Sequence, residues 1–134
     1  MPHQSTFVMV KPDGVRRGLV GAVISRFEAR GLSLDRMELT IPDGEIAARH
    51  YAEHREKSFY SDLLEFITSG PVVAMQWSGE SAVAVARTMM GSTNPVTALP
   101  GTIRGDFGLD VQENIVHGSD SPESAERELD IWFG

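Results

Sequence analysis

Two uninterrupted apolar runs constrain the fold of this chain more than any other feature of its sequence. Thr6–Val10 and Val72–Met75 carry apolar side chains at almost every position, with Lys11-Pro12-Asp13-Gly14 following the first run and Gly70-Pro71 preceding the second. Successive side chains of a strand point to opposite faces of its sheet, so a strand that is apolar throughout must be covered on both faces. The two runs therefore predict two central strands of a sheet with helices packed on it.

The segments around these runs predict weaker strands and several amphipathic helices. Met37, Leu39 and Ile41 alternate with polar residues, which is typical of an edge strand with one face in water. Ile115–His117 is predicted to form a fourth, short strand. Apolar residues recur at helical spacing in five further segments: Val20–Phe27, Ile46–Tyr51, Phe59–Ile67, Ala82–Met89 and Ala125–Trp132. From Ser92 to about Val111 no period is sustained, and we expect a long loop there.

This order of elements predicts one α+β domain over residues 1–134, with a ferredoxin-like sandwich in which helices cover a four-stranded antiparallel sheet. A doubly wound Rossmann fold would need more buried parallel strands and a glycine fingerprint. The sequence has no G-x-G-x-x-G segment after the first run and no G-x-x-x-x-G-K-[ST] segment anywhere. Any phosphate would therefore be bound without a P-loop.

Composition narrows the classes of partner and compartment. The formal net charge of -7 leaves no strong basic footprint for nucleic acid. No apolar run approaches the ~18–20 residues that cross a bilayer, so we expect no membrane partner. The sequence contains no cysteine, which excludes disulfides and thiolate metal ligands, and it begins without the charged and apolar blocks of a signal peptide. We therefore expect a cytoplasmic location.

The run Asn114–Asp120 places a histidine, His117, at the end of a predicted strand and directly before a Gly-Ser-Asp turn. Ser121 can then cap a helix that has proline at its first position. Glu128 lies seven residues after this cap on the same face of the helix, so its carboxylate can look back at the end of the strand. A histidine nucleophile needs such a partner to fix its tautomer and ring angle. A buried histidine bonded to a backbone carbonyl is the simpler alternative.

Three cations stand near strand ends or in the long loop: Lys11, Arg87 and Arg104. Each has an ordinary interpretation by itself, as a solvated lysine or as an arginine at the edge of the core. Together with the Thr93 hydroxyl and a glycine-rich loop, they are the groups that a polyphosphate needs where no P-loop exists. Phe59 could serve as a stacking platform, although its apolar neighbour Leu63 suits a core aromatic residue equally well.

These segments resemble the nucleoside diphosphate kinase family. Asn114–Asp120 is similar to the family's active-site signature, N-x-x-H-[GA]-S-D. Four further segments match the family in order: Lys11–Gly14, Ser69–Val72, Thr93–Pro95 and Pro100–Phe107. The resemblance extends from Thr6 to Phe133, and several segments at compatible spacing make it far more specific than any single motif.

The resemblance implies a ping-pong transfer of the γ-phosphoryl group from a nucleoside triphosphate to a nucleoside diphosphate through a phosphohistidine on His117. Glu128 and Ser119 would position that histidine. The implied phosphate contacts are Lys11, Arg87, Thr93 and Arg104, with Tyr51 nearby. Lys11 and Asn114 would contact the ribose. Phe59 and Val111 would sandwich the base through contacts that any base can make, which implies broad nucleotide tolerance.

The resemblance also implies a cofactor and an assembly. Mg²⁺ would bridge the phosphates rather than occupy a protein cage, and it would reach Asp120 through water. The family implies a homo-oligomer built from dimers, with a hexamer favoured and a tetramer as the alternative. Which imidazole nitrogen of His117 accepts the phosphoryl group stays open at this point.

Two other functions fit parts of the sequence. A nucleotide-binding regulatory or scaffold protein would keep the pocket without turnover, and the intact set of His117, Glu128 and Arg104 counts against it. A ferredoxin-like RNA-binding module would need aromatic residues on a central strand and a basic face. The two apolar runs contain a single aromatic residue, Phe7, in an acidic chain, so this function fits least well.

Overall fold

The two apolar runs form the two central strands of a four-stranded antiparallel sheet in the computed structural model, which describes residues 2–134. The strands are β1 (His3–Val10), β2 (Ser33–Thr40), β3 (Val72–Glu80) and β4 (Val116–Gly118). They lie in the spatial order β2-β3-β1-β4, and each neighbouring pair is antiparallel. This arrangement confirms the predicted α+β, ferredoxin-like fold.

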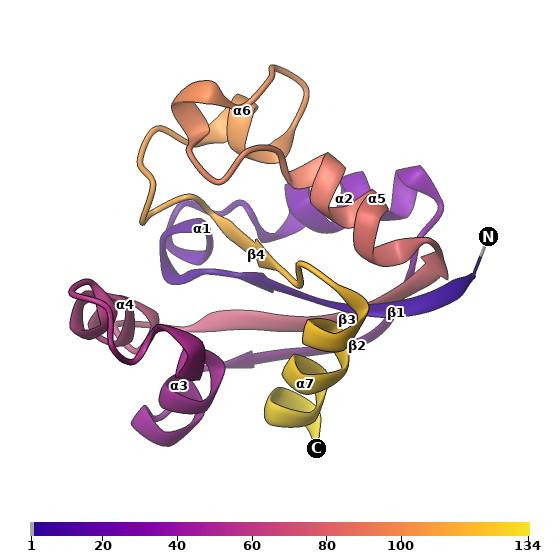
Figure 1. Ribbon diagram of the computed structural model, residues 1–134. Helices are drawn as coiled ribbons and strands as arrows, with labels where there is room; N and C mark the ends of the chain where they lie inside the picture. Colours follow the sequence, from indigo (N-terminus) through magenta and orange to yellow (C-terminus); the bar gives the residue numbers. More distant parts are fainter. Residues whose placement is uncertain (1) are drawn as a thin grey trace.

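Helices cover both faces of this sheet (Figure 1). They are α1 (Pro12–Arg16), α2 (Val20–Arg30), α3 (Gly44–His50), α4 (Tyr60–Ile67), α5 (Ala82–Met90), α6 (Ile103–Phe107) and α7 (Pro122–Phe133), with short 3-10 helices at Ala52–His54 and Pro95–Thr97. α2 and α5 lie over one face, and α3, α4 and α7 lie over the other. Val8 and Val10 of β1 pack into the core under α2 and α5, whereas Phe7 and Met9 pack into the opposite core. The central strands are apolar throughout because both of their faces are covered.

Local sequence signals set the ends of two helices. The Ser121 hydroxyl oxygen accepts a hydrogen bond from the Ser124 N–H at 3.1 Å, and Pro122 occupies the first helical position. α7 therefore begins where the sequence predicts it. Gly31 ends α2 with a φ of 103°, a left-handed conformation that glycine adopts without steric cost. Within residues 2–134, every helix is too short or too polar to cross a membrane.

The apolar side chains of β2 lie differently from what their alternation suggests. β2 is an edge strand, as predicted, but Met37 and Leu39 near its end are 55% and 66% exposed, and Ile41 directly after it is 62% exposed. Alternation establishes that the three side chains share a face, but it does not establish that a helix covers that face. In the described chain the helices leave this part of the sheet open.

The segment Ser92–Val111 is more ordered than a simple loop, because it contains a 3-10 helix and α6. The Thr102 hydroxyl oxygen caps α6 by accepting a hydrogen bond from the Gly105 N–H at 3.0 Å. Similarly, the predicted turn at Lys11–Gly14 opens the five-residue helix α1. Helices of one or two turns are too short for a 3.6-residue apolar period to show, so the pattern alone could not reveal them.

Candidate active site

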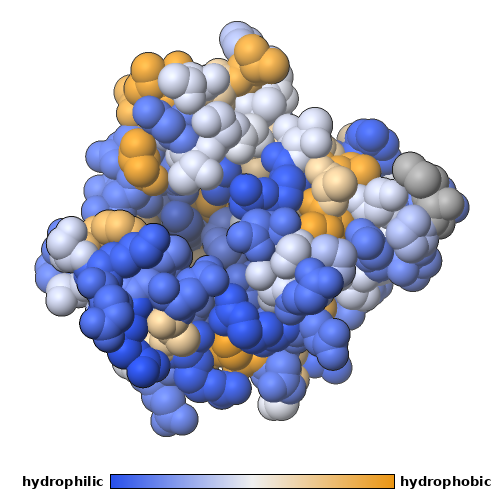
Figure 2. Space-filling model, viewed as in Figure 1, coloured by the Kyte–Doolittle hydropathy of each residue, from blue (hydrophilic) through white to orange (hydrophobic). Residues whose placement is uncertain are grey.

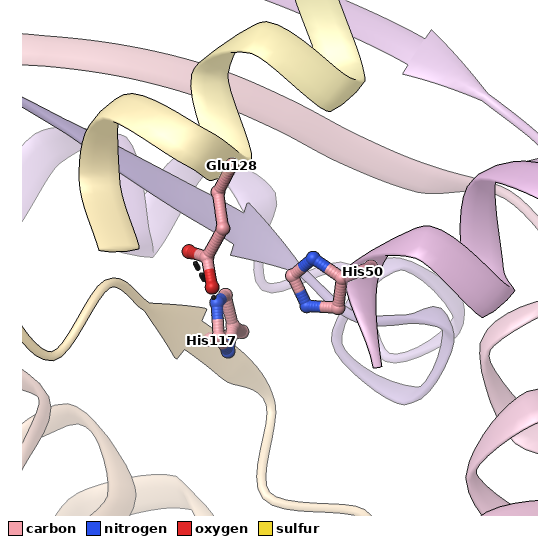
Figure 3. Close-up of side chains that lie close together, drawn as sticks. All are labelled: His50, His117 and Glu128. Atoms are coloured by element: carbon pink, nitrogen blue, oxygen red, sulfur yellow. Dashed lines mark hydrogen bonds and ion pairs between the residues drawn. The ribbon is translucent and has the colours of Figure 1, made fainter. Parts of the chain in front are cut away.

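His117 lies on the short strand β4, opposite Met9 of β1. Its Nε2 is 2.9 Å from Oε1 of Glu128, which projects from α7 (Figure 3). The hydroxyl of Ser119 donates a hydrogen bond to the same carboxylate oxygen at 2.6 Å. The predicted strand end and helix face therefore meet. Because a carboxylate can only accept, the Nε2 atom carries a proton, and the neutral ring keeps its lone pair on Nδ1.

Glu128 is a buried carboxylate, 4% exposed, whose charge is balanced by its neighbours. Burial by itself would raise the pKa of Glu128, but the hydrogen bonds from His117 and Ser119, with the attraction of His117 and His50 when either ring is protonated, outweigh burial and lower that pKa. Arg127 adds a contact of 3.6 Å to the other carboxylate oxygen. Glu128 is therefore ionised at neutral pH and can balance positive charge that develops on His117.

The backbone just before this histidine has an unusual conformation. Ile115 has a φ of 78°, in the left-handed region that a β-branched residue rarely adopts. Its N–H donates to Oδ2 of Asp13 at 3.0 Å, and its carbonyl oxygen accepts from the N–H of Lys11 at 2.8 Å. Gly14 permits the close approach, since a Cβ there would lie 3.0 Å from the Ile115 carbonyl oxygen. The Lys11–Gly14 segment thus holds the turn that leads into β4 by hydrogen bonds to the N–H and the carbonyl oxygen of Ile115.

Replacing Asp13 with alanine is expected to lower the free energy of unfolding by about 1–3 kcal/mol, because the buried N–H of Ile115 would lose its acceptor. Asp13→Asn keeps an acceptor oxygen at the same place and should lose less. Urea unfolding monitored by circular dichroism measures both variants. An Asp13→Ala protein as stable as the wild type would show that the hydrogen bond from Ile115 to Asp13 does not stabilise this turn.

Hydrogen bonds connect Lys11 to two other segments of the chain. Its Nζ donates to Oδ1 of Asn114 at 2.8 Å, and the Asn114 amide donates to the carbonyl oxygen of Thr93 at 2.9 Å. Burial and the charge of Arg104 lower the pKa of Lys11 to about 8, against the opposing attraction of Asp13. A buried ammonium group of this kind gains stability when an anionic ligand comes close.

The two predicted arginines differ in exposure. Arg104 is 4% exposed and donates to the carbonyl oxygens of Gly91 and Val116 at 2.9 Å and 2.7 Å, while its buried Nε has no partner among the described residues. Burial and the charge of Arg87 lower the pKa of Arg104 to about 10, so it is charged at neutral pH. Arg87 is open to solvent and donates to the carbonyl oxygen of Gly118 at 3.3 Å. Arg104 is therefore hydrogen-bonded to the backbone at the start of β4, whereas Arg87 is hydrogen-bonded to the backbone at its end.

Two cavities meet at His117. The larger, of about 600 Å³, has seven of the predicted residues in its wall: Lys11, Tyr51, Phe59, Thr93, Val111, Asn114 and His117. The smaller, of about 150 Å³, has five of them: Tyr51, Arg87, His117, Asp120 and Glu128. Figure 2 shows the surface hollowed between the α3–α4 region and the segment that carries α6. The volume of the larger cavity lies in the range of small-molecule sites.

Two apolar side chains stand at the wall of the larger cavity. Phe59 and Val111 are 45% and 54% exposed. This exposure is incompatible with the alternative that Phe59 is an ordinary core residue. Exposed apolar side chains at a cavity suit a flat apolar ring, because stacking and contact need no particular pattern of donors and acceptors.

Tyr51 lies between the two cavities and is 8% exposed. Burial and the charge of Glu128 raise the pKa of Tyr51 to about 12. Its hydroxyl therefore stays protonated across the physiological range and can donate a hydrogen bond to an anion in either cavity.

Asp120 is the predicted metal contact and lies in the wall of the smaller cavity. The Ser124 hydroxyl holds the pKa of Asp120 below its usual range against the opposing effect of burial, and the charge of Arg87 adds to the shift. The carboxylate is therefore ionised at neutral pH. A single such group suits Mg²⁺, which keeps several waters and binds mainly to substrate phosphates.

A second set of side chains has the donor types of a zinc site. One ligand atom from each of His50, His117 and Glu128 lies within 4.8 Å of the others. Hydrogen bonds already involve all three side chains, because His117 bonds Glu128 and Nδ1 of His50 accepts the indole N–H of Trp132 at 3.1 Å. Zinc would have to break both hydrogen bonds, so the cluster does not fit a resident metal ion.

The sequence pattern predicts no role for two residues beside the site, Asp13 and His50. Asp13 stands in a predicted turn, and its partner Ile115 is 102 residues away along the chain. His50 lies within the short predicted helical segment Ile46–Tyr51, where no local signal marks it. The match of Lys11–Gly14 to a family segment could have drawn attention to Asp13, but nothing comparable marks His50.

Comparisons with known protein sequences agree with one another. A family model described as nucleoside diphosphate kinase matches residues 4–134. Nucleoside diphosphate kinases of Exiguobacterium sp. and Archaeoglobus fulgidus are each 61% identical to this chain over 130 residues. The match covers 97% of this chain, with 94% of the Exiguobacterium protein and 86% of the Archaeoglobus protein.

Solved structures show the same similarity. The apo nucleoside diphosphate kinase of Encephalitozoon cuniculi superposes with a TM-score of 0.96 at 44% identity, over 98% of this chain and 89% of that one. The halophilic nucleoside diphosphate kinase of Halobacterium salinarum, solved in complex with CDP, has a TM-score of 0.96 at 48% identity. That match covers 98% of this chain and 88% of the Halobacterium chain.

Proposed function

Because the chain belongs to the nucleoside diphosphate kinase family, we propose that it moves the γ-phosphoryl group from a nucleoside triphosphate to a nucleoside diphosphate by a ping-pong mechanism through His117. Membership of this family makes the chain a nucleotide-binding phosphotransferase with nucleoside diphosphate kinase activity. One observation supports the proposed intermediate above all. Glu128 forms a hydrogen bond with Nε2 of His117, so the free lone pair of the ring is on Nδ1. His117 lies in the walls of both cavities.

In the first half-reaction, the Nδ1 lone pair attacks the γ-phosphorus in line with the bond to the β–γ bridging oxygen. The N–P bond forms, the P–O bond breaks, and the nucleoside diphosphate leaves with that electron pair on its terminal phosphate. His117 keeps its Nε2 proton, so the phosphorylated ring carries positive charge that the buried carboxylate of Glu128 balances. A second nucleoside diphosphate then attacks the phosphohistidine and reverses these steps.

A loose phosphoryl transition state needs positioning and charge neutralisation more than acid–base chemistry. Lys11 and Arg87, in the walls of the two cavities, are proposed to hold the phosphates, with donors from Thr93 and Tyr51. Arg104 is proposed to contribute charge from behind β4, since its guanidinium is bonded to the backbone. Mg²⁺, reaching Asp120 through water, would neutralise phosphate charge when bound with the nucleotide.

The base is proposed to lie between Phe59 and Val111, with the ribose against Lys11 and Asn114. Apolar contacts to the face of a base do not recognise the hydrogen-bonding groups on its edge, which supports broad base tolerance. The CDP bound to the Halobacterium salinarum enzyme shows that a protein 48% identical to this chain binds a pyrimidine diphosphate.

We also propose a cytoplasmic homo-oligomer, with a hexamer favoured over a tetramer. The lack of cysteine accords with that compartment. Exposed Met37, Leu39 and Ile41 at the edge of the sheet supply apolar surface that a subunit contact would cover. Light scattering would give the size of the assembly.

Initial-rate kinetics with ATP and dTDP test the proposed mechanism. A ping-pong reaction gives parallel lines in double-reciprocal plots and supports ATP–ADP exchange without a second acceptor. Intersecting lines together with no partial exchange would show direct transfer between two bound nucleotides, and the phosphohistidine intermediate would then be wrong.

The pH dependence of kcat/KM for ATP should reflect the protonation state of Lys11. Its pKa is lowered to about 8 by burial and by Arg104, so the ammonium group is charged below that pH and neutral above it. We expect kcat/KM for ATP to fall as the pH rises through about 8, while kcat falls at higher pH because bound phosphates favour the charged lysine. Lys11→Gln should lose this alkaline decline at a lower overall kcat/KM. The same decline in the variant would assign it to another group.

A further inference from the structure

Three aromatic rings, from Phe7, His50 and Trp132, form a buried cluster behind His117. The ring of His50, from the end of α3, meets His117 edge-to-face, with centroids 4.6 Å apart and an angle of 75° between the rings (Figure 3). Phe7 of β1 lies 5.9 Å from His117 and 5.5 Å from Trp132 of α7, on which it stacks. His50 is only 3% exposed and Phe7 is fully buried, so the cluster forms a closely packed wall against the ring of His117.

The orientation of His50 is itself determined by a hydrogen bond. The indole N–H of Trp132 can only donate, and it lies 3.1 Å from Nδ1 of His50. That Nδ1 must therefore be unprotonated, and the neutral ring carries its proton on Nε2. Trp132 thus fixes both the tautomer and the ring plane of His50, as a carboxylate does for His117.

His50 is also kept neutral by its surroundings. Burial lowers the pKa of His50 well below its ordinary value, and a positive charge on His117 of β4 acts in the same direction. Arg127 of α7 and Lys11 after β1 add to this effect, while Glu128 of α7 opposes it. A neutral neighbour matters because the phosphorylated ring of His117 is positively charged, and a second charge at this distance would repel it.

We propose that His50 is a positioning residue for His117, held in place by the indole of Trp132. This inference rests on the proposed function, since the orientation of His117 matters for the transfer only if Nδ1 is the acceptor. The ring of His50 blocks rotation of the His117 ring, so that Nε2 stays on Glu128 and Nδ1 stays turned away from it. Without that contact, His117 would sample orientations in which the lone pair no longer meets the γ-phosphorus.

The test compares three variants of the full chain: His50→Ala, Trp132→Phe and the control Trp77→Phe. Trp77 is buried like Trp132, but it lies in the opposite core, and its indole nitrogen has no hydrogen-bond partner among the described residues. Each variant is mixed with ATP and Mg²⁺ in a rapid single turnover, and histidine tautomers are read from long-range ¹H–¹⁵N spectra. ATP affinity is measured separately.

We expect His50→Ala and Trp132→Phe to slow the phosphorylation of His117 by roughly 10- to 100-fold, because a misplaced nucleophile loses proximity, while ATP affinity changes little. The His117 signal should shift from a single Nε2–H tautomer to a mixture. Trp77→Phe should keep the wild-type rate and tautomer. Should His50→Ala fail to fold, the more conservative Trp132→Phe still tests the inference.

Wild-type rates and an unchanged His117 tautomer in Trp132→Phe would overturn the inference. A slower rate with an unchanged tautomer and weaker ATP binding would also overturn it, since that pattern indicates general damage to the pocket. Failure of the proposed function looks different, because the wild-type protein itself would then not become phosphorylated on His117.

Discussion

Replacing His117 with glutamine is expected to lower phosphoryl exchange between ATP and dTDP by at least about 10⁴-fold, because the side chain then lacks a nucleophilic nitrogen. The amide N–H of glutamine can still donate to Glu128, so the buried carboxylate keeps a partner and the fold should be preserved. Initial-rate assays measure the exchange, and calorimetric titration with ADP measures binding. We expect ADP affinity to stay within a few-fold of the wild type.

His3→Gln is a matched control for this substitution. His3 is an exposed histidine at the start of β1, so its replacement should leave exchange unchanged. Exchange by the His117→Gln protein at more than a few per cent of the wild-type rate would mean that another group accepts the phosphoryl group. A loss of ADP binding alongside exchange would instead place His117 in nucleotide binding.

Replacing Glu128 with alanine is expected to give the second largest loss, roughly 10²- to 10⁴-fold in the rate at which ATP phosphorylates His117. Two causes act together. The Nε2 proton loses its acceptor 2.9 Å away, so the ring is free to adopt the other tautomer, whose Nδ1 carries a proton and cannot attack. The positive charge of the phosphorylated ring also loses the buried carboxylate that balances it.

Glu126→Ala is the control for Glu128→Ala, since Glu126 is an exposed glutamate on the same helix. It should phosphorylate at the wild-type rate. Ser119→Ala should fall between the two, because it removes one donor to the Glu128 carboxylate but leaves the carboxylate in place. Single-turnover phosphorylation followed by rapid quench separates this step from nucleotide release. Equal rates for the Glu126 and Glu128 variants would show that the carboxylate does not orient the ring.

Features governed by nearby residues could be predicted from the sequence. The cap at Ser121 begins α7, and seven residues of regular helix then bring Glu128 to the strand end, where it meets His117. The two central strands were equally clear, because burial on both faces leaves an apolar residue at almost every position. In both cases the sequence signal that predicts the element lies within a dozen residues.

Features that depend on distant contacts could not be predicted in this way. Asp13 holds a strained Ile115 across 102 residues, and the role of His50 depends on rings contributed by β4 and α7. The pattern in β2 showed which side chains share a face but not that the face stays open. The sequence likewise could not show that the Arg104 guanidinium donates to two backbone carbonyls, because one of them, Gly91, ends α5 and the other, Val116, lies in β4.

The position of the phosphoryl group on the protein tests the central claim most directly. Incubation with [γ-³²P]ATP and Mg²⁺, followed by alkaline hydrolysis and chromatography of the phosphoamino acids, separates the two isomers of phosphohistidine. Peptide mapping identifies the residue. The hydrogen bond from Nε2 to Glu128 predicts acid-labile, base-stable label on His117, carried by Nδ1. Label on Nε2, label on another residue, or no label at all would contradict the account.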